Sequence, residues 1–378
     1  MSRRSYEAHD RGRRLRPFWL PALLALSACT CQSGDMAMLG QHSFELPVVQ
    51  AHAWYDTRHH NPDGGGFHNI WQPPNEYATM KAAGWLLGRA FTGRSFEPIA
   101  HRQLDPAELE RKMAEPVNHF RVYWMGHSSA LMRIGDSLVL TDPMFSPRAS
   151  PVGFAGPERI TPLPLRLDQI PMPDVVIISH NHYDHLDQAS ITELSRLRQP
   201  LYLVPLGLKA LVESWGAAHV LELDWWQYVE VDGVIYTCTP AQHFSSRSPF
   251  DRNETLWASW AIEDRTSGTR VYFGGDTGYA SFFSDIAHRL GSPDLAMIPV
   301  GAYQPRWFMR EVHVTPEEGL QAYQDLGATE FLGIHWGTFD LADEPLTEPL
   351  ERVSRSVAER GLNPNRIHLL EVGGSLER

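Results

Sequence analysis

Four side chains of the kinds that bind metal ions lie within six residues of the chain, in the stretch His-Asn-His-Tyr-Asp-His. They are His180, His182, Asp184 and His185, and they follow the apolar run at residues 174–178 almost directly. Imidazole nitrogens and carboxylate oxygens are the ligands that Zn²⁺ takes in tetrahedral sites. A short turn can hardly aim four side chains at one tetrahedral ion, so the spacing predicts two neighbouring metal ions.

Two four-coordinate ions need more ligands than this turn supplies. His243, Asp276 and His335 are three further candidates, because each follows an apolar run that is typical of a buried strand. Side chains at strand ends share one edge of a sheet, so positions that are distant in sequence can meet there. Gly274 and Gly275 allow the backbone to turn sharply just before Asp276. We therefore predict one metal centre built from the turn and these three residues.

The first 28 residues differ from the rest of the chain. A basic stretch leads into apolar residues 18–28, which is typical of an export signal and too short for a spanning helix. Leu-Ser-Ala-Cys at residues 26–29 resembles the lipobox of bacterial lipoproteins, in which cleavage leaves Cys29 as a lipid-modified N-terminus. Cleavage of an ordinary signal peptide near Ala28 is the alternative. We expect a lipid-anchored protein of the bacterial cell envelope, on its periplasmic face.

Composition and charge narrow the class of protein. The 378 residues are 43% apolar, which is ample for a packed core. Residues 1–28 carry six arginines and two acids, so their removal would change the formal charge from −12 to about −16. An acidic chain repels phosphate backbones, which argues against nucleic acid as a partner. Cys238 lies in a strand-like run and is expected to be a buried free thiol, so no disulfide framework is predicted.

Two segments are predicted after the signal. Residues 29–120 contain turn signals such as Asn-Pro-Asp-Gly-Gly-Gly, and we expect an N-terminal extension that packs on a catalytic domain at residues 121–378. In that domain many short apolar runs alternate with a few helical segments, which predicts an α+β fold of mixed sheets flanked by helices. Strands are expected at residues 137–141, 174–179, 201–205, 219–223, 234–239, 257–262, 269–274, 294–300, 331–335 and 367–372, and helices at residues 188–198, 207–215, 280–290, 316–326 and 347–360.

Several other polar and aromatic residues have simpler interpretations. Asp187 precedes Gln-Ala-Ser and is predicted to be a helix N-cap rather than a ligand. His59, His60 and His68 are expected in a solvated loop rather than at a metal ion. Large aromatic residues are more often packed in a core than placed in a substrate channel, so we expect core positions for the tryptophans at residues 225, 226, 307 and 336.

The seven predicted ligands together resemble the pattern of the metallo-β-lactamase superfamily. The resemblance implies an αββα sandwich with a dinuclear zinc site at one edge, and therefore two Zn²⁺ per chain as cofactors. It also implies how the ligands divide: the first ion would take His180, His182 and His243, the second would take Asp184, His185 and His335, and Asp276 would bridge them. Because these ligands suit several ions, iron or manganese in one position stays open.

Motifs outside the ligands resemble the family of N-acyl-phosphatidylethanolamine-hydrolysing phospholipases D, over roughly residues 71–374. They include Gly126-His-Ser-Ser, Leu140-Thr-Asp-Pro, Gly275-Asp-Thr-Gly-Tyr, Ile298-Pro-Val-Gly-Ala-Tyr and Ile334-His-Trp-Gly-Thr-Phe. The resemblance implies hydrolysis of N-acyl-phosphatidylethanolamine or a related phospholipid to N-acylethanolamine and phosphatidic acid. Hydroxide held between the two zinc ions would attack, since metal binding lowers the pKa of water from about 15.7 towards 7. His127 and Asp142 would orient ligands through hydrogen bonds.

The resemblance also implies roles for residues beside the metal ions. Asp184 and Asp276 would be ligands first, with orientation or proton transfer as second duties, and Tyr183 and His313 would bind or protonate the substrate. The expected partners are the phospholipid and, through the anchor, a membrane; a homodimer is left open. One alternative is a metallo-hydrolase of another ester, lactone or β-lactam. Another is a zinc-binding protein without catalytic activity.

Overall fold

Strand β2 (Phe120–Gly126) places alternate side chains in two different cores. Phe120 and Trp124 pack into one cluster of buried residues, whereas Tyr123 and Met125 pack into another. Successive side chains of a strand point to opposite faces of its sheet, so a strand that is buried throughout needs a packed layer on each side. The fold supplies those layers as a second sheet and a set of helices.

The computed structural model describes residues 46–71, 81, 84–85, 88 and 94–378. These residues belong to one unit, Leu46–Arg378. The predicted export signal at residues 1–28 and the predicted lipidation site Cys29 lie outside the described residues. Within the described residues, no helix combines the length and the apolar character needed to cross a bilayer.

Two mixed sheets form the centre of this unit. The first runs in the order β1 (Gln50–Ala51), β8 (Gln227–Val231), β9 (Val234–Thr239), β10 (Ser259–Asp264), β11 (Arg270–Phe273), β12 (Leu295–Pro299), β13 (Glu330–Ile334) and β14 (Ile367–His368). The second runs in the order β15 (Ser375–Glu377), β2, β3 (Ser129–Ile134), β4 (Ser137–Thr141), β5 (Val175–Ile177), β6 (Leu201–Pro205) and β7 (Val220–Leu223). Pairing is antiparallel from β8 to β11 and from β15 to β4, and parallel from β11 to β14 and from β4 to β7.

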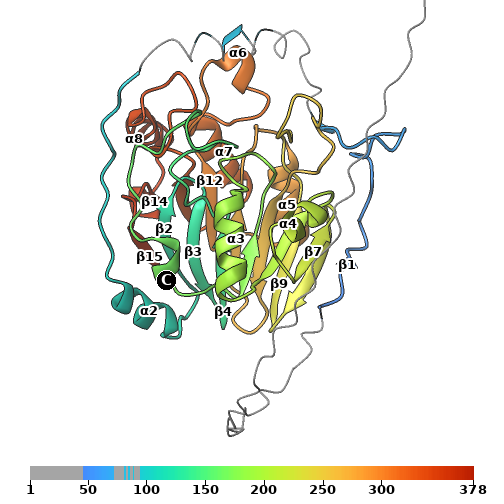
Figure 1. The fold of residues 1–378 in the computed structure, drawn as a ribbon. Coiled ribbons are helices and arrows are strands. Elements are labelled where there is room, and N and C mark those ends of the chain that lie inside the picture. Colours follow the sequence, from blue (N-terminus) through green and yellow to red (C-terminus); the bar gives the residue numbers. More distant parts are fainter. Residues whose placement is uncertain (1–45, 72–80, 82–83, 86–87, 89–93) are drawn as a thin grey trace, which may run out of the picture. The chain divides into compact units, whose positions relative to one another are not determined.

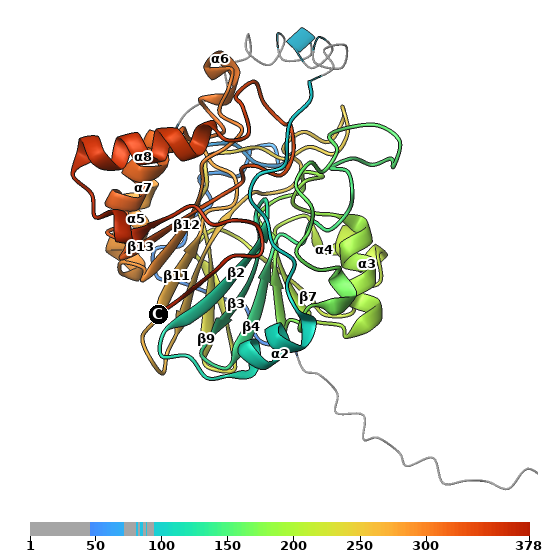
Figure 2. The same cartoon turned by 90° about the vertical axis from the view of Figure 1, so that its left-hand side faces the viewer.

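Helices cover the outer face of each sheet (Figures 1 and 2). On the second sheet they are α2 (Pro106–Ala114), α3 (Gln188–Leu197) and α4 (Lys209–Ser214), whose buried residues share one core with that sheet. On the first sheet they are α5 (Phe282–Leu290), α7 (Pro316–Asp325) and α8 (Glu348–Arg360). The short helix α6 (Arg306–Met309) lies beyond the strand ends, and the 3₁₀ turns η1 (Leu167–Gln169) and η2 (Pro364–Arg366) complete the elements. The predicted αββα sandwich is confirmed.

Part of the predicted N-terminal extension joins the first sheet. In β1, Gln50 and Ala51 pair antiparallel with Tyr228 and Gln227 of β8, at the edge of the sheet. The main chain of His52 continues this contact by donating to the carbonyl of Trp226. A domain boundary near residue 120 stays a prediction.

Most predictions for single side chains agree with the structure, and two are wrong. Asp187 caps α3 by accepting a hydrogen bond from the main chain of Ser190, and Cys238 is a buried free thiol. Trp307, however, lies on the short helix α6 and is 46% exposed. His59 is only 1% exposed, since its ring stacks on Trp225 and its Nε2 is satisfied by a carboxylate described below. The predicted tryptophans at 225, 226 and 336 are buried.

Candidate metal centre

The predicted ligands follow strand ends that meet at one edge of the two sheets. The turn that begins at His180 follows β5 in the second sheet, and His243 follows β9 in the first. Asp276 follows β11, and His335 follows β13 directly. The parallel part of each sheet sends successive strands to the same edge, and the distances below place these loops against one another.

Three histidines form the first cluster. His182 Nδ1 lies 2.7 Å from His180 Nε2 and 3.2 Å from His243 Nε2. All three side chains have a ligand atom close enough to share one ion. The structure thus brings together the three residues that were predicted for the first metal ion.

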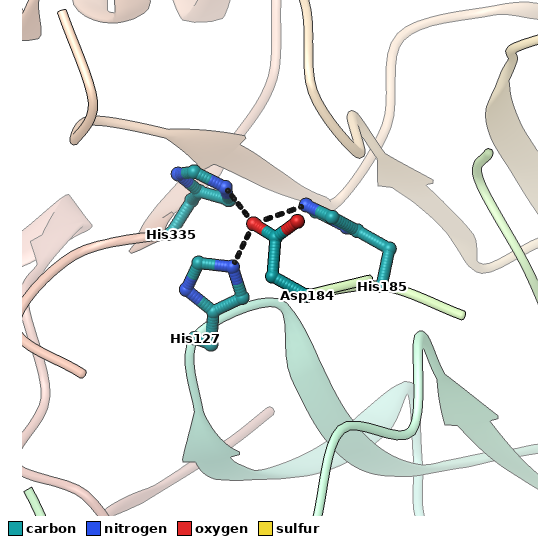
Figure 3. A group of neighbouring side chains, drawn as sticks. All are labelled: His127, Asp184, His185 and His335. Atoms are coloured by element: carbon teal, nitrogen blue, oxygen red, sulfur yellow. Dashed lines mark hydrogen bonds and ion pairs between the residues drawn. The ribbon is translucent and has the colours of Figure 1, made fainter. Parts of the chain in front are cut away.

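The second cluster surrounds the carboxylate of Asp184 (Figure 3). Its Oδ2 lies 3.3 Å from His185 Nε2 and 3.3 Å from His335 Nε2, which are the other ligands predicted for the second ion. His127 Nε2 lies nearer, at 2.8 Å, and comes from the turn between β2 and β3. His127 was expected to orient a ligand, and this hydrogen bond places it for that role.

Asp276 lies between the two clusters. Its Oδ2 is 3.2 Å from His185 Nε2, and its Oδ1 is 3.1 Å from His335 Nε2. The same Oδ2 lies 3.8 Å from His243 Nε2 and 4.0 Å from His180 Nε2. One carboxylate therefore faces histidines of both predicted ligand sets, which is the position expected for a bridging ligand.

Several buried nitrogen and oxygen atoms of the centre lack a hydrogen-bond partner in the described part of the chain, and a bound cation would satisfy two of them. Among the described residues, His185 Nε2, Asp276 Oδ1 and His313 Nδ1 are buried and make no hydrogen bond. Buried polar atoms without a partner are rare and costly, and a positive ion at this place would satisfy the first two. His313 Nδ1 lies 3.9 Å from Asp276 Oδ2, so the predicted substrate-binding histidine adjoins the clusters without belonging to the predicted ligand set.

Charges and burial keep most of these side chains in the form that binds metal. Burial lowers the pKa of His182 to about 3 and that of His243 to about 4, so both rings are neutral near pH 7. Burial alone would raise the pKa of Asp184 and Asp276, but the charges and hydrogen bonds of the surrounding histidines, His185 foremost, together outweigh burial and hold both pKa values well below their usual range. For His335, the nearby carboxylates outweigh burial and raise the pKa to about 9. Binding of metal would therefore release protons.

Hydrogen bonds from outside the clusters orient the rings of three predicted ligands. Asp142 Oδ2 lies 2.6 Å from His185 Nδ1 and accepts a second bond from Ser179 Oγ. His180 Nδ1 contacts the same hydroxyl at 2.9 Å, and His243 Nδ1 donates to the carbonyl of Val312 at 2.8 Å. Such partners set the ring orientation and the tautomer of metal-binding histidines.

Replacing Asp142 by asparagine should weaken metal binding at the second cluster. The amide keeps the shape of the side chain but loses the charge that supports His185, and such changes reduce metal affinity or activity by about 10- to 100-fold. Metal affinity measured by calorimetry, beside kcat, checks this expectation. Unchanged values for both quantities would show that the 2.6 Å contact does not support the centre.

Three residues of the candidate metal centre and its supporting contacts have left-handed backbone conformations. His127, Asp142 and His335 all have positive φ, at 54°, 32° and 59°. They are three of the eight residues other than glycine with positive φ among the described residues, and such conformations cost about 1–3 kcal/mol each. The main chain of His335 donates to the carbonyl of His127, so two of these residues hold each other in place.

Gly275 makes the close approach that lets Asp276 reach the centre. It has a φ of +56°, and an added Cβ would lie 2.5 Å from Ser179 Cβ. Gly275→Ala should therefore lower the free energy of unfolding by about 1–3 kcal/mol and displace Ser179 from its partners. Gly268→Ala is the matched control, because Gly268 has a φ of +73° but no atom within 4 Å of an added Cβ. Equal effects of the two changes in urea titrations would contradict this account.

Tyr183 faces a different region from its neighbours in the turn. Its hydroxyl donates to the carbonyl of Arg247, and the guanidinium of Arg247 lies 3.9 Å from the centre of its ring. Both residues line a cavity of about 680 Å³ beside the start of α3. Arg247 was not predicted. The residues next to it in the sequence form no motif that would indicate its contact with Tyr183. Asn69, which contacts His243, was missed for the same reason.

Comparisons with known proteins agree with this architecture. Residues 138–336, which include all seven predicted ligands, match the model of the β-lactamase superfamily domain. Among solved structures, a possible metal-dependent hydrolase from Veillonella parvula superposes with a TM-score of 0.57 at 17% identity, covering 69% of this chain and 100% of that one. The isothiocyanate hydrolase from Delia radicum gut bacteria gives 0.56 at 18% identity, covering 68% and 98%. These likenesses show the fold.

Sequence relatives are closer. An uncharacterised protein of Mycobacterium tuberculosis (strain H37Rv) is 45% identical over 237 residues, and the matched region spans 61% of this chain and 62% of that protein. The N-acyl-phosphatidylethanolamine-hydrolysing phospholipase D 1 of Caenorhabditis elegans is 38% identical over 63% of this chain and 69% of its own length. The mitochondrial enzyme of that name from Saccharomyces cerevisiae is 39% identical over 66% of this chain and 54% of its own length.

These matches place the chain within a family. The superfamily model covers more than half of the sequence, and the nematode relative exceeds 30% identity over more than two thirds of its length. The matched region spans about three fifths of the length of the mycobacterial relatives. The chain therefore belongs to the metallo-β-lactamase superfamily and is homologous to the N-acyl-phosphatidylethanolamine-hydrolysing phospholipases D.

Proposed function

We propose that the protein is a zinc-dependent phosphodiesterase of phospholipase D type, acting on N-acyl-phosphatidylethanolamine or a related phospholipid. The names of the nematode and yeast relatives support this substrate class. The observation that carries the proposal is the position of Asp276, within 4.0 Å of histidines in both clusters. Two adjacent ions suit a phosphodiester, because together they can face its attacking and leaving oxygens.

The residues fit two zinc ions. His180, His182 and His243 would hold the first; Asp184, His185 and His335 would hold the second, with Asp276 shared. Bound there, the ions would lower the pKa of water towards 7 and neutralise the charge of the phosphodiester. Imidazole and carboxylate ligands favour zinc, and the protein has supporting hydrogen bonds for the rings on both sides of the centre.

Groups beside the clusters would bind the substrate. Burial lowers the pKa of His313 well below its usual value, so the ring is neutral and offers one N–H group to a phosphate oxygen. Tyr183 lines the cavity of about 680 Å³, which falls in the usual size range of ligand pockets and would take part of the lipid. In the reaction, the oxygen of water bonds to phosphorus while the bond from phosphorus to the ethanolamine oxygen breaks. The leaving oxygen gains a proton, giving N-acylethanolamine and phosphatidic acid.

The location of the protein is a separate proposal. After cleavage of residues 1–28, a lipid on Cys29 would hold the enzyme at a bacterial membrane, on the periplasmic face, where its substrate lies. Cys29→Ser should then move the protein from the membrane fraction to the soluble periplasmic fraction. Equal distribution of the variant and the unchanged protein would contradict the anchor.

A labelled product analysis tests the function. Zinc-loaded protein is incubated in H₂¹⁸O with vesicles of N-acyl-phosphatidylethanolamine, phosphatidylethanolamine or phosphatidylcholine, and the products are measured by mass spectrometry. We expect N-acylethanolamine without label and phosphatidic acid with one ¹⁸O atom. Label in the N-acylethanolamine, or release of fatty acid, would mean that a different bond breaks.

The alternative is a metallo-hydrolase of another ester, of a lactone or of a β-lactam. The superfamily match alone supports this function equally well. It includes the predicted metal ligands but does not indicate which substrate the protein binds. The same preparation is therefore assayed with small lactones and β-lactams. Their cleavage, together with intact phospholipid in every vesicle, would favour the alternative.

A further inference from the structure

The side-chain amide of Asn69 forms hydrogen bonds with both the N–H and the carbonyl of the predicted ligand His243. Asn69 Nδ2 donates to the carbonyl of His243 at 2.8 Å, and the main-chain N–H of His243 donates to Asn69 Oδ1 at 3.2 Å. Asn69 lies outside residues 138–336, which the superfamily model matches. One amide thus satisfies the donor and the acceptor of a metal-binding residue that is distant in sequence.

The side chain of His243 is held as well as its main chain. Its ring is fixed by the bond from Nδ1 to the carbonyl of Val312, and its side chain is fully buried. With the main chain held by Asn69, His243 Nε2 stays 3.2 Å from His182 Nδ1 and 3.8 Å from Asp276 Oδ2. Release of the main chain would let Nε2 move relative to both.

Asn69 can act as a fixed point because its own segment is anchored. Asp224 Oδ1 lies 2.6 Å from the buried His59 Nε2, and Asp224 Oδ2 lies 2.8 Å from His60 Nε2. Tyr55 donates to the same carboxylate at 2.8 Å. Asp224 lies on the loop between β7 and β8, so this cluster ties residues 55–60 to the body of the protein.

A second anchor lies between that cluster and Asn69. Phe67 donates through its main chain to the carbonyl of Asn253 at 2.9 Å, and Gly66 approaches so closely that an added Cβ would lie 2.2 Å from that oxygen. The main chain of Asn253 in turn donates to the carbonyl of Ser245, two residues after His243. The segment that precedes Asn69 and the loop that follows His243 are therefore held together next to the amide contact.

We propose that Asn69 is a positioning residue for the first metal ion, so that the N-terminal segment completes the metal centre. The proposal rests on the proposed function only in requiring that His180, His182 and His243 bind a metal ion. It predicts that loss of the amide lowers the affinity of this cluster while the second cluster keeps its ion. Supporting partners of metal ligands typically change affinity or activity by about 10- to 100-fold, and we expect a decrease in this range.

Two variants separate the positioning role from a general effect on folding. Asn69→Ala removes both bonds, whereas Asn69→Asp keeps the shape but places an oxygen where Nδ2 faces the carbonyl of His243. Asn61→Asp is the matched control, because it makes the same chemical change in the same segment. The amide of Asn61 bonds to the carbonyl of Gly65 and to the ring of His68, and within the described part of the chain it makes no hydrogen bond with a predicted metal ligand.

The test uses Co²⁺ as a spectroscopic probe of the full-length, metal-free protein. Titration of each variant, followed by visible absorption, gives the affinity of each site; the unfolding temperature of the metal-free protein reports general damage. For both Asn69 variants we expect one of the two Co²⁺ transitions to weaken by about 10-fold or more. The unfolding temperature of the metal-free protein should change no more than in Asn61→Asp.

Each other outcome would overturn the inference. Unchanged Co²⁺ affinities in both Asn69 variants would exclude a positioning role. A lower unfolding temperature with unchanged affinity per folded molecule, or equal weakening of both transitions, would reduce Asn69 to a structural residue. If the unchanged protein binds two Co²⁺ ions but leaves phospholipid intact, the proposed function fails while the Asn69 result still stands.

Discussion

Asp184→Asn should reduce hydrolysis by about 10³-fold, which corresponds to roughly 4 kcal/mol of transition-state stabilisation. Three imidazoles converge on Asp184 Oδ2, at 2.8 Å for His127 and 3.3 Å for both His185 and His335. Asparagine has nearly the same shape but no charge, so the second cluster would keep only the shared carboxylate of Asp276. The measurement is kcat for phospholipid hydrolysis together with zinc content per chain, which should fall from two ions towards one.

Asp136→Asn is the control for this change. Its side chain is 97% exposed in the turn between β3 and β4, and its ion pair with Arg133 is long, at 3.5 Å. The same chemical change at this surface position should leave kcat and zinc content unaltered. If Asp184→Asn kept full activity and His335→Ala were also active, the second cluster would take no part in the reaction.

Removal of metal should abolish activity and destabilise the fold. Ions that bind the native centre and not the unfolded chain stabilise the protein by mass action, by about 4 kcal/mol when free metal exceeds the dissociation constant 1,000-fold. Without them, the centre retains buried atoms that make no hydrogen bond, such as His185 Nε2 and Asp276 Oδ1. We expect the unfolding temperature to fall by several degrees after dialysis against a chelator.

The recovery of activity distinguishes metal loss from damage. Addition of Zn²⁺ should restore both the unfolding temperature and the rate, whereas Mg²⁺ should not, because Mg²⁺ prefers all-oxygen ligands. Chelator saturated with zinc beforehand serves as the control and should have no effect. Full activity and an unchanged unfolding temperature after complete metal removal would contradict a metal-dependent mechanism.

The bounds of strands with continuous apolar runs could be predicted closely from the sequence, whereas those of other strands could not. The expected strands at residues 137–141, 201–205 and 234–239 coincide with β4, β6 and β9. β2 was not predicted, because its sequence, Phe-Arg-Val-Tyr-Trp-Met-Gly, neither alternates regularly nor forms a run of aliphatic residues like those of β4 and β6. The strand expected at residues 367–372 ends at His368 in the ladder, since Val372 turns to bridge His101 instead.

The grouping of the predicted ligands in space could be predicted from the sequence, whereas some of the residues that contact them from outside could not. The ligands stood out because they combine metal-binding side chains with positions after strand-like runs, and that rule also applies to His243, Asp276 and His335. Asn69 offered no comparable signal. Its function depends on hydrogen bonds to a main chain 174 residues away, and such contacts follow from the packing of loops rather than from any local pattern.

The most direct test of the dinuclear centre is an anomalous-difference map from crystals of the zinc-loaded protein, recorded at the zinc absorption edge. We expect two peaks per chain, both at the edge of the sheets where the predicted ligands lie. One should lie among His180, His182 and His243, the other among Asp184, His185 and His335, and Asp276 should contact both. A single peak, or peaks only at other histidines, would contradict the two-metal centre from which the proposed hydrolysis is argued.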